Sequence, residues 1–244
     1  MIEVSHLHIS YPDGTRAIDD VSFSIGDGEC VALIGANGAG KSTLFLSLVG
    51  MLAPSEGSIR IDGEPVEKRT LASIRKRVGL VFQNPDDQLF MATIYDDLAF
   101  GPRNYGMDET AIEERVGEVL ESLCASHLRD KTPFKLSGGE KRLAALGSVL
   151  VLKPSVMLLD EPSSFLDPKA RRNLISILGA LPMTRLIATH DMDLALSVCR
   201  RVIILKDGRL FADGDAKTLL HDSALLDECG LEPPLCLIYK EERP

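Results

Sequence analysis

The chain contains no tryptophan, and all of its aromatic residues together make up 5% of its 244 positions. Cysteine is scarce as well: there are five, an odd number, and no two have the two-residue spacing of a zinc-binding or redox motif. This pattern argues against a disulfide framework and against a cysteine zinc site. We therefore expect free thiols, packed as small apolar side chains, in a reducing compartment.

Long apolar runs are also missing. The best candidate, residues 149–152, stops at Lys153 and Pro154, whereas a membrane-spanning helix needs roughly 18 to 20 apolar residues. The first residues lack the basic start and the apolar stretch of a secretory signal peptide. The sequence therefore predicts an intracellular protein that does not itself cross a membrane.

Basic residues are outnumbered by acidic ones, 27 Lys and Arg against 36 Asp and Glu, which gives a formal net charge of −9. Because a dedicated nucleic-acid binder normally carries a basic face, we expect no nucleic-acid partner. Hydrophobic residues make up 45% of the chain and charged residues 26%. This composition is typical of a globular domain with a substantial core.

Short apolar runs alternate with helical patterns along the chain, and this alternation predicts an α/β fold. The runs beginning at residues 78, 156, 185 and 202 are expected to be buried on both faces, as central parallel strands usually are. Residues 2–10 and 21–25 alternate in polarity and predict an antiparallel outer sheet, and the Asp207-Gly208 pair predicts a hairpin turn. The other strand candidates are 29–34, 58–61, 78–82, 156–159, 185–188 and 202–205.

Helical patterns dominate the middle third of the chain. Residues 111–123 carry an apolar stripe at helical spacing, and a second helix is expected at about 140–152. We therefore divide the chain into a core of about residues 1–87 and 153–225, a helical subdomain of about 88–152 inserted into that core, and a short C-terminal extension at 226–244.

A phosphate-binding loop is predicted directly after the strand at 29–34, where the sequence fits G-x-x-x-x-G-K-[ST]. Glycines let the backbone wrap closely around phosphate oxygens, and the helix that follows adds the positive end of its dipole. We expect Lys41 to reach the β- and γ-phosphates of a nucleotide and the Ser42 hydroxyl to bind Mg²⁺. The loop consists of Gly35, Ala36, Asn37, Gly38, Ala39, Gly40, Lys41, Ser42 and Thr43.

Two acidic residues end the apolar strand at 156–159, and the strand should deliver both to the carboxyl edge of the sheet, where ligands of open α/β sheets bind. Asp160 is expected to hold Mg²⁺, directly or through water, and Glu161 to polarise the water that attacks the γ-phosphate. Taken alone, this pattern is more typical of an ordinary strand end with solvated acids. Its occurrence together with the phosphate loop favours the catalytic interpretation.

The segment Leu-Ser-Gly-Gly-Glu at 136–140 stands directly before a predicted helix. Ser137 and Glu140 have the spacing of a capping box, which is one sufficient explanation. A capping box does not need the intervening pair Gly138 and Gly139, however, and a glycine-rich helix N-terminus is also an anion site. Both roles are expected.

These residues together resemble the ATPase subunits of ATP-binding-cassette (ABC) transporters over about residues 1–220. The resemblance implies a P-loop NTPase (RecA-like) core with an antiparallel β subdomain and a helical insertion that carries the signature motif. ATP and Mg²⁺ are then the expected ligands. The family motifs fall at Tyr11 (stacking on adenine), 35–43 (Walker A), Gln83 (Q-loop), 136–140 (signature), Asp160 and Glu161 (Walker B), 164–167 (D-loop) and His190 (switch histidine).

The resemblance also implies a shared nucleotide site in a homodimer, or in a heterodimer with a second ABC ATPase. The signature residues of one subunit, Ser137, Gly138, Gly139 and Glu140, would complete the site of the partner. His190 would contact the γ-phosphate, Gln83 would touch Mg²⁺, and Asp167 would connect the two sites. Two positions depart from the family pattern: Leu143 stands where arginine is frequent, and Phe165 replaces a small D-loop residue.

Residues 83–90 and 96–102 are similar to the corresponding segments of energy-coupling-factor importers, especially the cobalt and nickel branch. That resemblance implies two ATPases on a transmembrane coupling subunit, with a separate membrane subunit that binds cobalt, nickel or a vitamin. The chain would then be peripheral, at the cytoplasmic face of the inner membrane. A polar turn after Pro85 is the structural alternative for this segment.

Other interpretations stay open at this stage. One is a soluble, non-transport ABC ATPase that acts on a macromolecular partner, and another is a binding-only regulatory module. The signature motif argues against a P-loop kinase. His6 and His8 are either metal ligands or, as we expect, solvent-facing strand residues.

Overall fold

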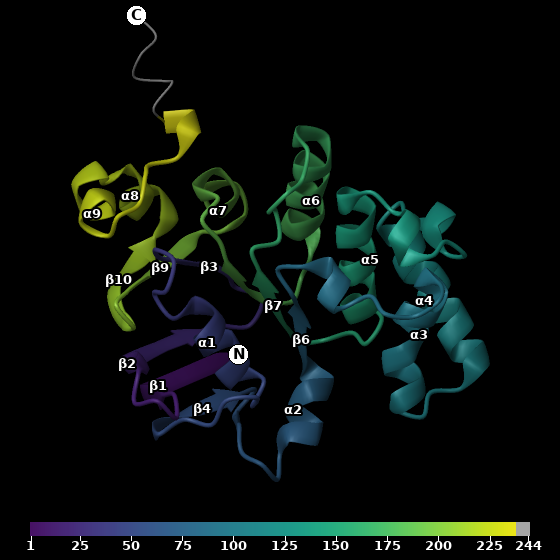
Figure 1. Ribbon diagram of the computed structural model, residues 1–244, viewed down its shortest axis with the longest axis horizontal. Helices are drawn as coiled ribbons and strands as arrows, with labels where there is room; N and C mark the ends of the chain where they lie inside the picture. Colours follow the sequence, from purple (N-terminus) through teal and green to yellow (C-terminus); the bar gives the residue numbers. More distant parts are fainter. Residues whose placement is uncertain (238–244) are drawn as a thin grey trace, which may run out of the picture.

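A computed structural model describes residues 1–237 of the chain, and its centre is a six-stranded sheet (Figure 1). Neighbouring strands within β9-β3-β8-β7-β6 run parallel, and only β10 at one edge is antiparallel. The strand order is β10 (Arg209–Asp215), β9 (Arg201–Lys206), β3 (Cys30–Ile34), β8 (Thr184–Ala188), β7 (Val156–Asp160) and β6 (Val78–Val81).

A smaller antiparallel sheet packs below the first, as seen in Figure 1, with helix α1 (Lys41–Leu48) between them. Alternate side chains of its strand β1 are buried against α1 and the larger sheet, which explains the alternating polarity of that segment. The order is β2 (Arg16–Ile25), β1 (Ile2–Ser10), β4 (Glu56–Ile61) and β5 (Glu64–Pro65). The predicted α/β architecture with an antiparallel outer sheet is therefore confirmed.

Helices α3 (Ile94–Asn104), α4 (Glu109–Ser122) and α5 (Gly138–Leu150) pack together at the end of the molecule beyond β6. The stripe predicted on α4 is buried there, and Gly147 of α5 lets Leu98 and Leu123 approach closely. Three short 3₁₀ helices connect these elements: η1 (Pro85–Asp87), η2 (Ser126–Leu128) and η3 (Pro133–Lys135).

Of the remaining helices, the one at residues 71–77 lies below the larger sheet in Figure 1, and the others lie above it. Within residues 1–237, no helix combines the length and the apolar character that crossing a bilayer requires. Of the predicted C-terminal extension at 226–244, the last seven positions, 238–244, lie outside the described residues. The helices are α2 (Leu71–Arg77), α6 (Pro168–Ala180), α7 (Met192–Val198), α8 (Ala216–His221) and α9 (Ser223–Glu228).

The prediction that the run at residue 78 is a doubly buried central strand is wrong. Strand β6 is the edge strand of the sheet, and its Gly79 and Leu80 are only half-buried. The other three runs, β7, β8 and β9, are buried as predicted. The hairpin at Asp207 and Gly208 is confirmed, with positive φ angles of 50° and 75°.

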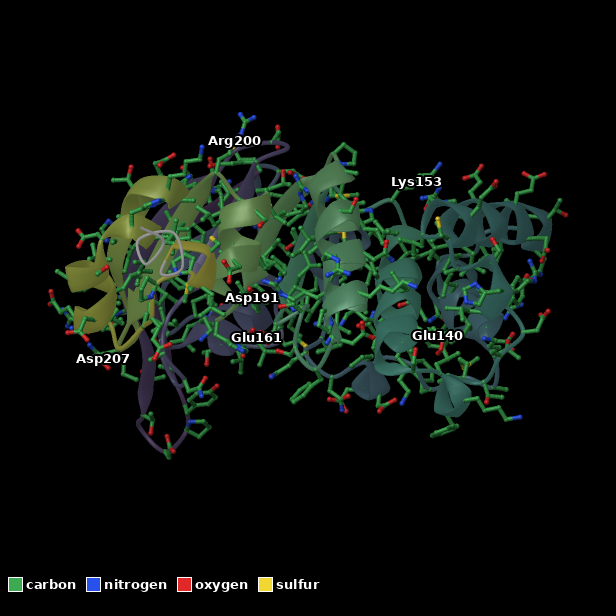
Figure 2. The ribbon with its side chains drawn as sticks, turned by 90° about the horizontal axis from the view of Figure 1, so that it is seen from above. Glu140, Lys153, Glu161, Asp191, Arg200 and Asp207 are labelled. Atoms are coloured by element: carbon green, nitrogen blue, oxygen red, sulfur yellow. The ribbon has the colours of Figure 1, made fainter. Side chains whose placement is uncertain are left out.

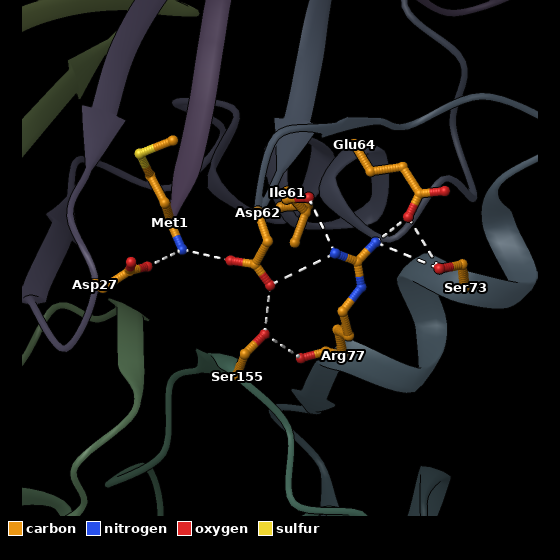
Figure 3. A network of polar contacts seen from close by, with 8 residues as sticks. All are labelled: Met1, Asp27, Ile61, Asp62, Glu64, Ser73, Arg77 and Ser155. Carbon is orange, nitrogen blue, oxygen red and sulfur yellow. Dashed lines mark hydrogen bonds and ion pairs between the residues drawn. The ribbon is translucent and has the colours of Figure 1, made fainter.

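A polar network at Asp62 ties the smaller sheet to the larger one (Figure 3). Asp62 follows β4; its Oδ1 lies 2.6 Å from the amino nitrogen of Met1, and its Oδ2 accepts a hydrogen bond of 2.7 Å from Ser155. Arg77 of α2 lies 3.7 Å from the same carboxylate. Burial acts to raise the pKa of Asp62, but the hydrogen bonds from Met1 and Ser155 outweigh it and lower that pKa. The network fixes the segment just before β7, and therefore the strand that carries the acidic pair.

Candidate active site

The sheet brings together four loops that the sequence keeps far apart. Strands β3, β8, β7 and β6 are parallel neighbours, so the loops after their carboxyl ends meet at one edge. One of them is the phosphate loop, and the other three carry His190, Glu161 and Gln83. Residues of all four loops line one cavity of about 950 Å³. Along the long axis of the molecule, Glu161 lies between Asp207 of the β9–β10 turn and Glu140 of α5 (Figure 2).

Glycine is required in the phosphate loop by conformation and by space. Gly40 has a φ of 103°, and a Cβ there would lie 2.7 Å from the carbonyl oxygen of Ala17. Gly38 has a φ of 83°, and a Cβ added to it would meet nothing within 4 Å, so the loop is open on that side. This geometry is a cradle for an anion.

Lys41 is 8% exposed, and its ammonium group lies inside the loop. Its Nζ donates hydrogen bonds of 2.7 and 3.2 Å to the carbonyl oxygens of Gly35 and Ala36. Burial lowers the pKa of Lys41, while the carboxylates of Glu161 and Asp160 act in the opposite direction. The lysine is therefore held with its charge toward the cavity, where a phosphate would stabilise it.

Ser42 and Asp160 form an oxygen-rich pair beside the lysine. The Ser42 hydroxyl donates a hydrogen bond of 3.1 Å to Oδ2 of Asp160. Burial raises the pKa of Asp160, although this hydrogen bond and the positive charges of Lys41 and Arg142 oppose the rise. A hydroxyl and a carboxylate are the hard oxygen donors that Mg²⁺ prefers, and a buried carboxylate gains from a cation. The residues present therefore fit the ion.

Glu161 and His190 contact each other directly. Oε2 of Glu161 lies 2.8 Å from Nδ1 of His190 and accepts a hydrogen bond of 3.2 Å from the His190 backbone N–H. Glu161 is 7% exposed and has a φ of 45°, a conformation that its backbone N–H stabilises by bonding to the carbonyl of Ala188. The imidazole, in contrast, is 67% exposed. The strained turn holds the carboxylate rigidly while the ring reaches into the cavity.

Asp191, which the sequence reasoning missed, fixes the loop that carries His190. Its carboxylate accepts hydrogen bonds from Arg171 Nε at 2.6 Å and Ser163 Oγ at 3.0 Å, and it caps α7 through the N–H of Leu194. Burial acts to raise the pKa of Asp191, but these donors prevail and lower it. The only sequence signal was an aspartate at a helix start.

Tyr11 faces the same cavity from the end of the smaller sheet. It is 38% exposed, and its hydroxyl lies 3.0 Å from Oγ1 of Thr43. The neighbouring wall comes from the start of β2, the β9–β10 turn and the segment after α9. None of these carries a nucleotide-binding motif, so the sequence did not indicate the wall. These wall residues are Arg16, Ala17, Asp207, Gly208, Gly230 and Leu231.

The signature segment lies apart from this cavity. Ser137, Gly138, Gly139 and Glu140 start α5, and none of them is among the described residues that line the cavity. The predicted capping box is present: Ser137 Oγ accepts from the Glu140 N–H at 3.4 Å, and Glu140 Oε2 accepts from the Ser137 N–H at 2.9 Å. The hydrogen bonds from Ser137 lower the pKa of Glu140 to about 2.

Asp167 of the D-loop also has a local role. Its carboxylate caps α6 by accepting hydrogen bonds of 2.8 and 2.9 Å from the N–H groups of Lys169 and Ala170, and these bonds lower its pKa. Phe165 nearby is 93% exposed and has a φ of 64°. Both residues therefore lie on the surface beside the signature segment rather than in the cavity.

The two histidines of β1 pair with aspartates of β2. His6 Nδ1 lies 2.9 Å from Oδ1 of Asp20, and His8 Nδ1 lies 3.1 Å from Oδ1 of Asp19. His6 is exposed, as expected for a solvent-facing residue, whereas His8 is half-buried. No group of three or more potential metal-ligating side chains occurs in residues 1–237.

Comparison with known proteins agrees with this geometry. The model of the family described as "ABC transporter" matches residues 18–164. A putative ABC transporter ATP-binding protein of Geobacter sulfurreducens is 47% identical over 97% of this chain and 95% of its own length. An energy-coupling factor transporter ATP-binding protein, EcfA, of Methanothermobacter thermautotrophicus is 45% identical over 96% of this chain and 77% of its own.

Solved structures give the same result. The structure of cbiO1 from Clostridium perfringens, part of the ABC transporter complex cbiONQ, superimposes with a TM-score of 0.85 at 36% identity, covering 99% of this chain and 98% of the other. The ATP-binding cassette MJ0796, in a dimeric post-hydrolysis state with ADP and Pi, gives a TM-score of 0.79 at 27% identity, covering 88% of this chain and 99% of the other. The chain therefore belongs to the ABC transporter family, and it is one of that family's ATP-hydrolysing subunits.

Proposed function

We propose that this chain supplies the energy for import by a transporter of the energy-coupling-factor type. The observation that carries the proposal is the similarity to relatives named EcfA over nearly the whole chain, 45% identical over 96% of it. The likeness to cbiO1, at a TM-score of 0.85, supports the same subtype. The cargo class that follows is a cobalt or nickel ion or a vitamin.

The nucleotide is assigned to the large cavity. The adenine ring stacks on Tyr11, and the phosphates lie in the loop at 35–43, held by backbone N–H groups and by Lys41. Ser42 and Asp160 hold Mg²⁺, with Gln83 facing the same position. The ion supplies neutralisation of the phosphate charge.

Hydrolysis is assigned to the pair Glu161 and His190. His190 occupies Oε2 of Glu161, so we assign Oε1 to the attacking water, whose proton this carboxylate takes. The exposed ring of His190 orients the γ-phosphate. Because Glu161 sits on a rigid turn, it needs little reorganisation during the reaction.

The signature residues are assigned to the nucleotide of a second subunit, which is either a copy of this chain or a related ATPase. The N-terminus of α5, with Ser137, Gly138, Gly139 and Glu140, does not line the cavity that the described residues form, which suits an anion brought by a partner. Asp167 lies on the same surface and would connect the two sites. ATP then favours the closed dimer by binding both halves.

The membrane partner is assigned to the region between the core and the helices at 88–152, which we treat as a subdomain. Phe90 and Phe100 form an edge-to-face pair there, with ring centroids 5.0 Å apart, and they are 63% and 41% exposed. Exposed aromatic pairs of this kind suit helices of a membrane subunit. The chain would then lie at the cytoplasmic face of the membrane.

The test is reconstitution in vesicles with candidate transmembrane coupling and substrate-binding subunits. We expect ATP-dependent uptake of cobalt ions, nickel ions or one member of a vitamin panel, and none with a Glu161→Gln chain. Full ATPase activity with no uptake, and no co-purification with either membrane subunit, would contradict the proposal. That result would instead favour an ABC ATPase acting on a soluble macromolecule.

A further inference from the structure

Arg142 is the largest fully buried side chain of the molecule's described part, 2% exposed, and it forms no ion pair with a carboxylate of residues 1–237. Its guanidinium donates hydrogen bonds of 2.7 Å to the carbonyl oxygen of Phe82 and of 2.6 Å to that of Gln83. Its Nε has no hydrogen-bond partner among the described residues. A buried cation is costly, and two carbonyl groups offset that cost only in part.

The two carbonyl groups belong to the segment that positions Gln83. Strand β6 ends at Val81, so Phe82 and Gln83 have left the sheet, and their carbonyl oxygens need other donors. Gln83 lines the nucleotide cavity beside the acidic pair. The positive charge of Arg142 also acts to lower the pKa of Asp160, against the effect of burial. Arg142 therefore holds the backbone from which the Gln83 side chain projects.

Two further contacts join the same segment to α5. Gln88 accepts a hydrogen bond of 3.2 Å from the Phe82 N–H and donates one of 2.7 Å to the carbonyl of Ala145. Lys141 forms an ion pair of 2.6 Å with Asp86. Residues 82–88 are thus attached to α5 through the N–H and the carbonyl group of Phe82 and through the carboxylate of Asp86. They should therefore move with the helix as one unit.

Helix α5 also carries the signature at its N-terminus. Arg142 lies five positions after Ser137, about 7.5 Å along the helix axis at 1.5 Å per residue. The same rigid element therefore presents one end to the nucleotide of a partner and holds Gln83 at the chain's own nucleotide.

We propose that Arg142 is a positioning residue that couples the two nucleotide sites of the dimer. Docking of the partner's nucleotide on the signature of α5 is transmitted through the guanidinium to the backbone of Gln83 and so to the cation position next to Asp160. The proposal rests on the shared-site dimer of the proposed function. Its physical basis is one contiguous, buried set of contacts rather than proximity alone.

The test compares Arg142→Met, which keeps an unbranched apolar stem and removes the donors, with Arg142→Lys and with a matched control. Arg115→Met is that control, because Arg115 of α4 also donates to two carbonyl oxygens, those of Leu150 and Val151, but at the far end of α5. Binding is measured with a fluorescent ATP analogue, first in EDTA and then during titration with MgCl₂. Steady-state ATPase activity against ATP concentration gives the Hill coefficient.

For Arg142→Met we expect analogue binding in EDTA to stay within about threefold of wild type, because Lys41 and its loop are untouched. The MgCl₂ concentration that gives half of the maximal change in analogue binding should rise about tenfold, a typical magnitude for coupling between two sites. The Hill coefficient of ATP hydrolysis should fall toward one. Arg142→Lys should give intermediate values. Arg115→Met should lower the melting temperature without changing either quantity.

If Arg142→Met fails to fold, Gln88→Met replaces it, because it removes the second link between Phe82 and α5; the same two changes are expected. Unaltered MgCl₂ dependence and Hill coefficient in a folded variant would overturn the proposal. Equal changes in Arg115→Met would overturn it too, since they would show general loosening of α5. A wild-type chain that neither dimerises with ATP nor hydrolyses it would instead contradict the proposed function.

Discussion

Tyr11 brings two separable groups to the nucleotide cavity, an aromatic ring and a hydroxyl that lies 3.0 Å from Thr43. Stacking of a base on an aromatic ring contributes about 1–3 kcal/mol. Tyr11→Ala should therefore raise the KM for ATP by about 5- to 150-fold. Tyr11→Phe keeps the ring and loses one partly exposed hydrogen bond, so its KM should rise by less than about fivefold.

Inorganic triphosphate provides the control for this prediction, because it has the phosphates without the base. Its inhibition constant against ATP hydrolysis should be the same for wild type and both Tyr11 variants. If Tyr11→Ala weakens triphosphate as much as ATP, the ring acts by supporting Thr43 and the phosphate loop rather than by stacking.

Candidate site residues that belong to a spaced sequence motif were predictable from the sequence, whereas residues whose role depends on burial were not. The loop from Gly35 to Thr43 and the acidic pair at Asp160 follow strands, and their order along the chain predicts that they meet at one sheet edge. Arg142 and Asp191 carry no such pattern. The role of each depends on a hydrogen bond to a residue far away in sequence: Arg142 bonds to Phe82, and Asp191 bonds to Arg171. Only the packed structure brings these residues into contact.

At the scale of the helix, the capping box of α5 predicts a dependence of stability on pH. The N–H and hydroxyl of Ser137 lower the pKa of Glu140 to about 2 in the folded chain, from 4.5 as the ordinary value. The stabilisation is therefore complete above about pH 4.5 and is lost as the pH falls toward 2. Glutamine at this position makes the same box without titrating.

Between pH 6 and pH 4, wild type should lose about 1 kcal/mol more unfolding free energy than Glu140→Gln, measured by urea denaturation at each pH. Glu118→Gln, which changes an exposed carboxylate of α4 paired with Arg115, serves as the control and should follow wild type. Identical pH profiles for wild type and Glu140→Gln would show that the box does not protect the carboxylate.

Element boundaries show where local sequence was enough. The helices predicted at 111–123 and 140–152 exist but begin two residues earlier, because Asp108 and Ser137 cap them. Strand β2 begins at Arg16 rather than 21, since Asp19 and Asp20, which pair with the β1 histidines, interrupt its apolar alternation. The edge position of β6 depends on which strands lie beside it, and its own composition does not record that.

At the scale of the whole molecule, the proposed function implies that one chain holds only part of a nucleotide site. The cavity gathers the phosphate loop, the cation pair and the hydrolytic pair, while the signature segment and the exposed Phe165 face outward. A second subunit that docks its own signature on the open side of the cavity would complete both sites at once. Such an assembly makes ATP part of the interface, so the lifetime of the dimer should follow the lifetime of the γ-phosphate.

The substitution Glu161→Gln tests this link, because it should lengthen both lifetimes together. It keeps the size of the side chain and the contact with His190 but removes the group that takes the proton, so ATP hydrolysis should fall by about 10²- to 10⁴-fold. Affinity for ATP should stay within about threefold, because Lys41, Ser42 and Asp160 are unchanged. With ATP and MgCl₂, size-exclusion chromatography should then show a persistent dimer that wild type forms only transiently.

Glu118→Gln supplies the matched control, since it makes the same chemical change on an exposed surface of α4, and it should behave as wild type in both assays. Hydrolysis by Glu161→Gln at the wild-type rate would show that another group of the cavity is the catalytic base. Slow hydrolysis without a dimer would leave the chemistry in place but contradict the shared site, because an ATP molecule bound by both halves must hold them together for as long as it remains intact.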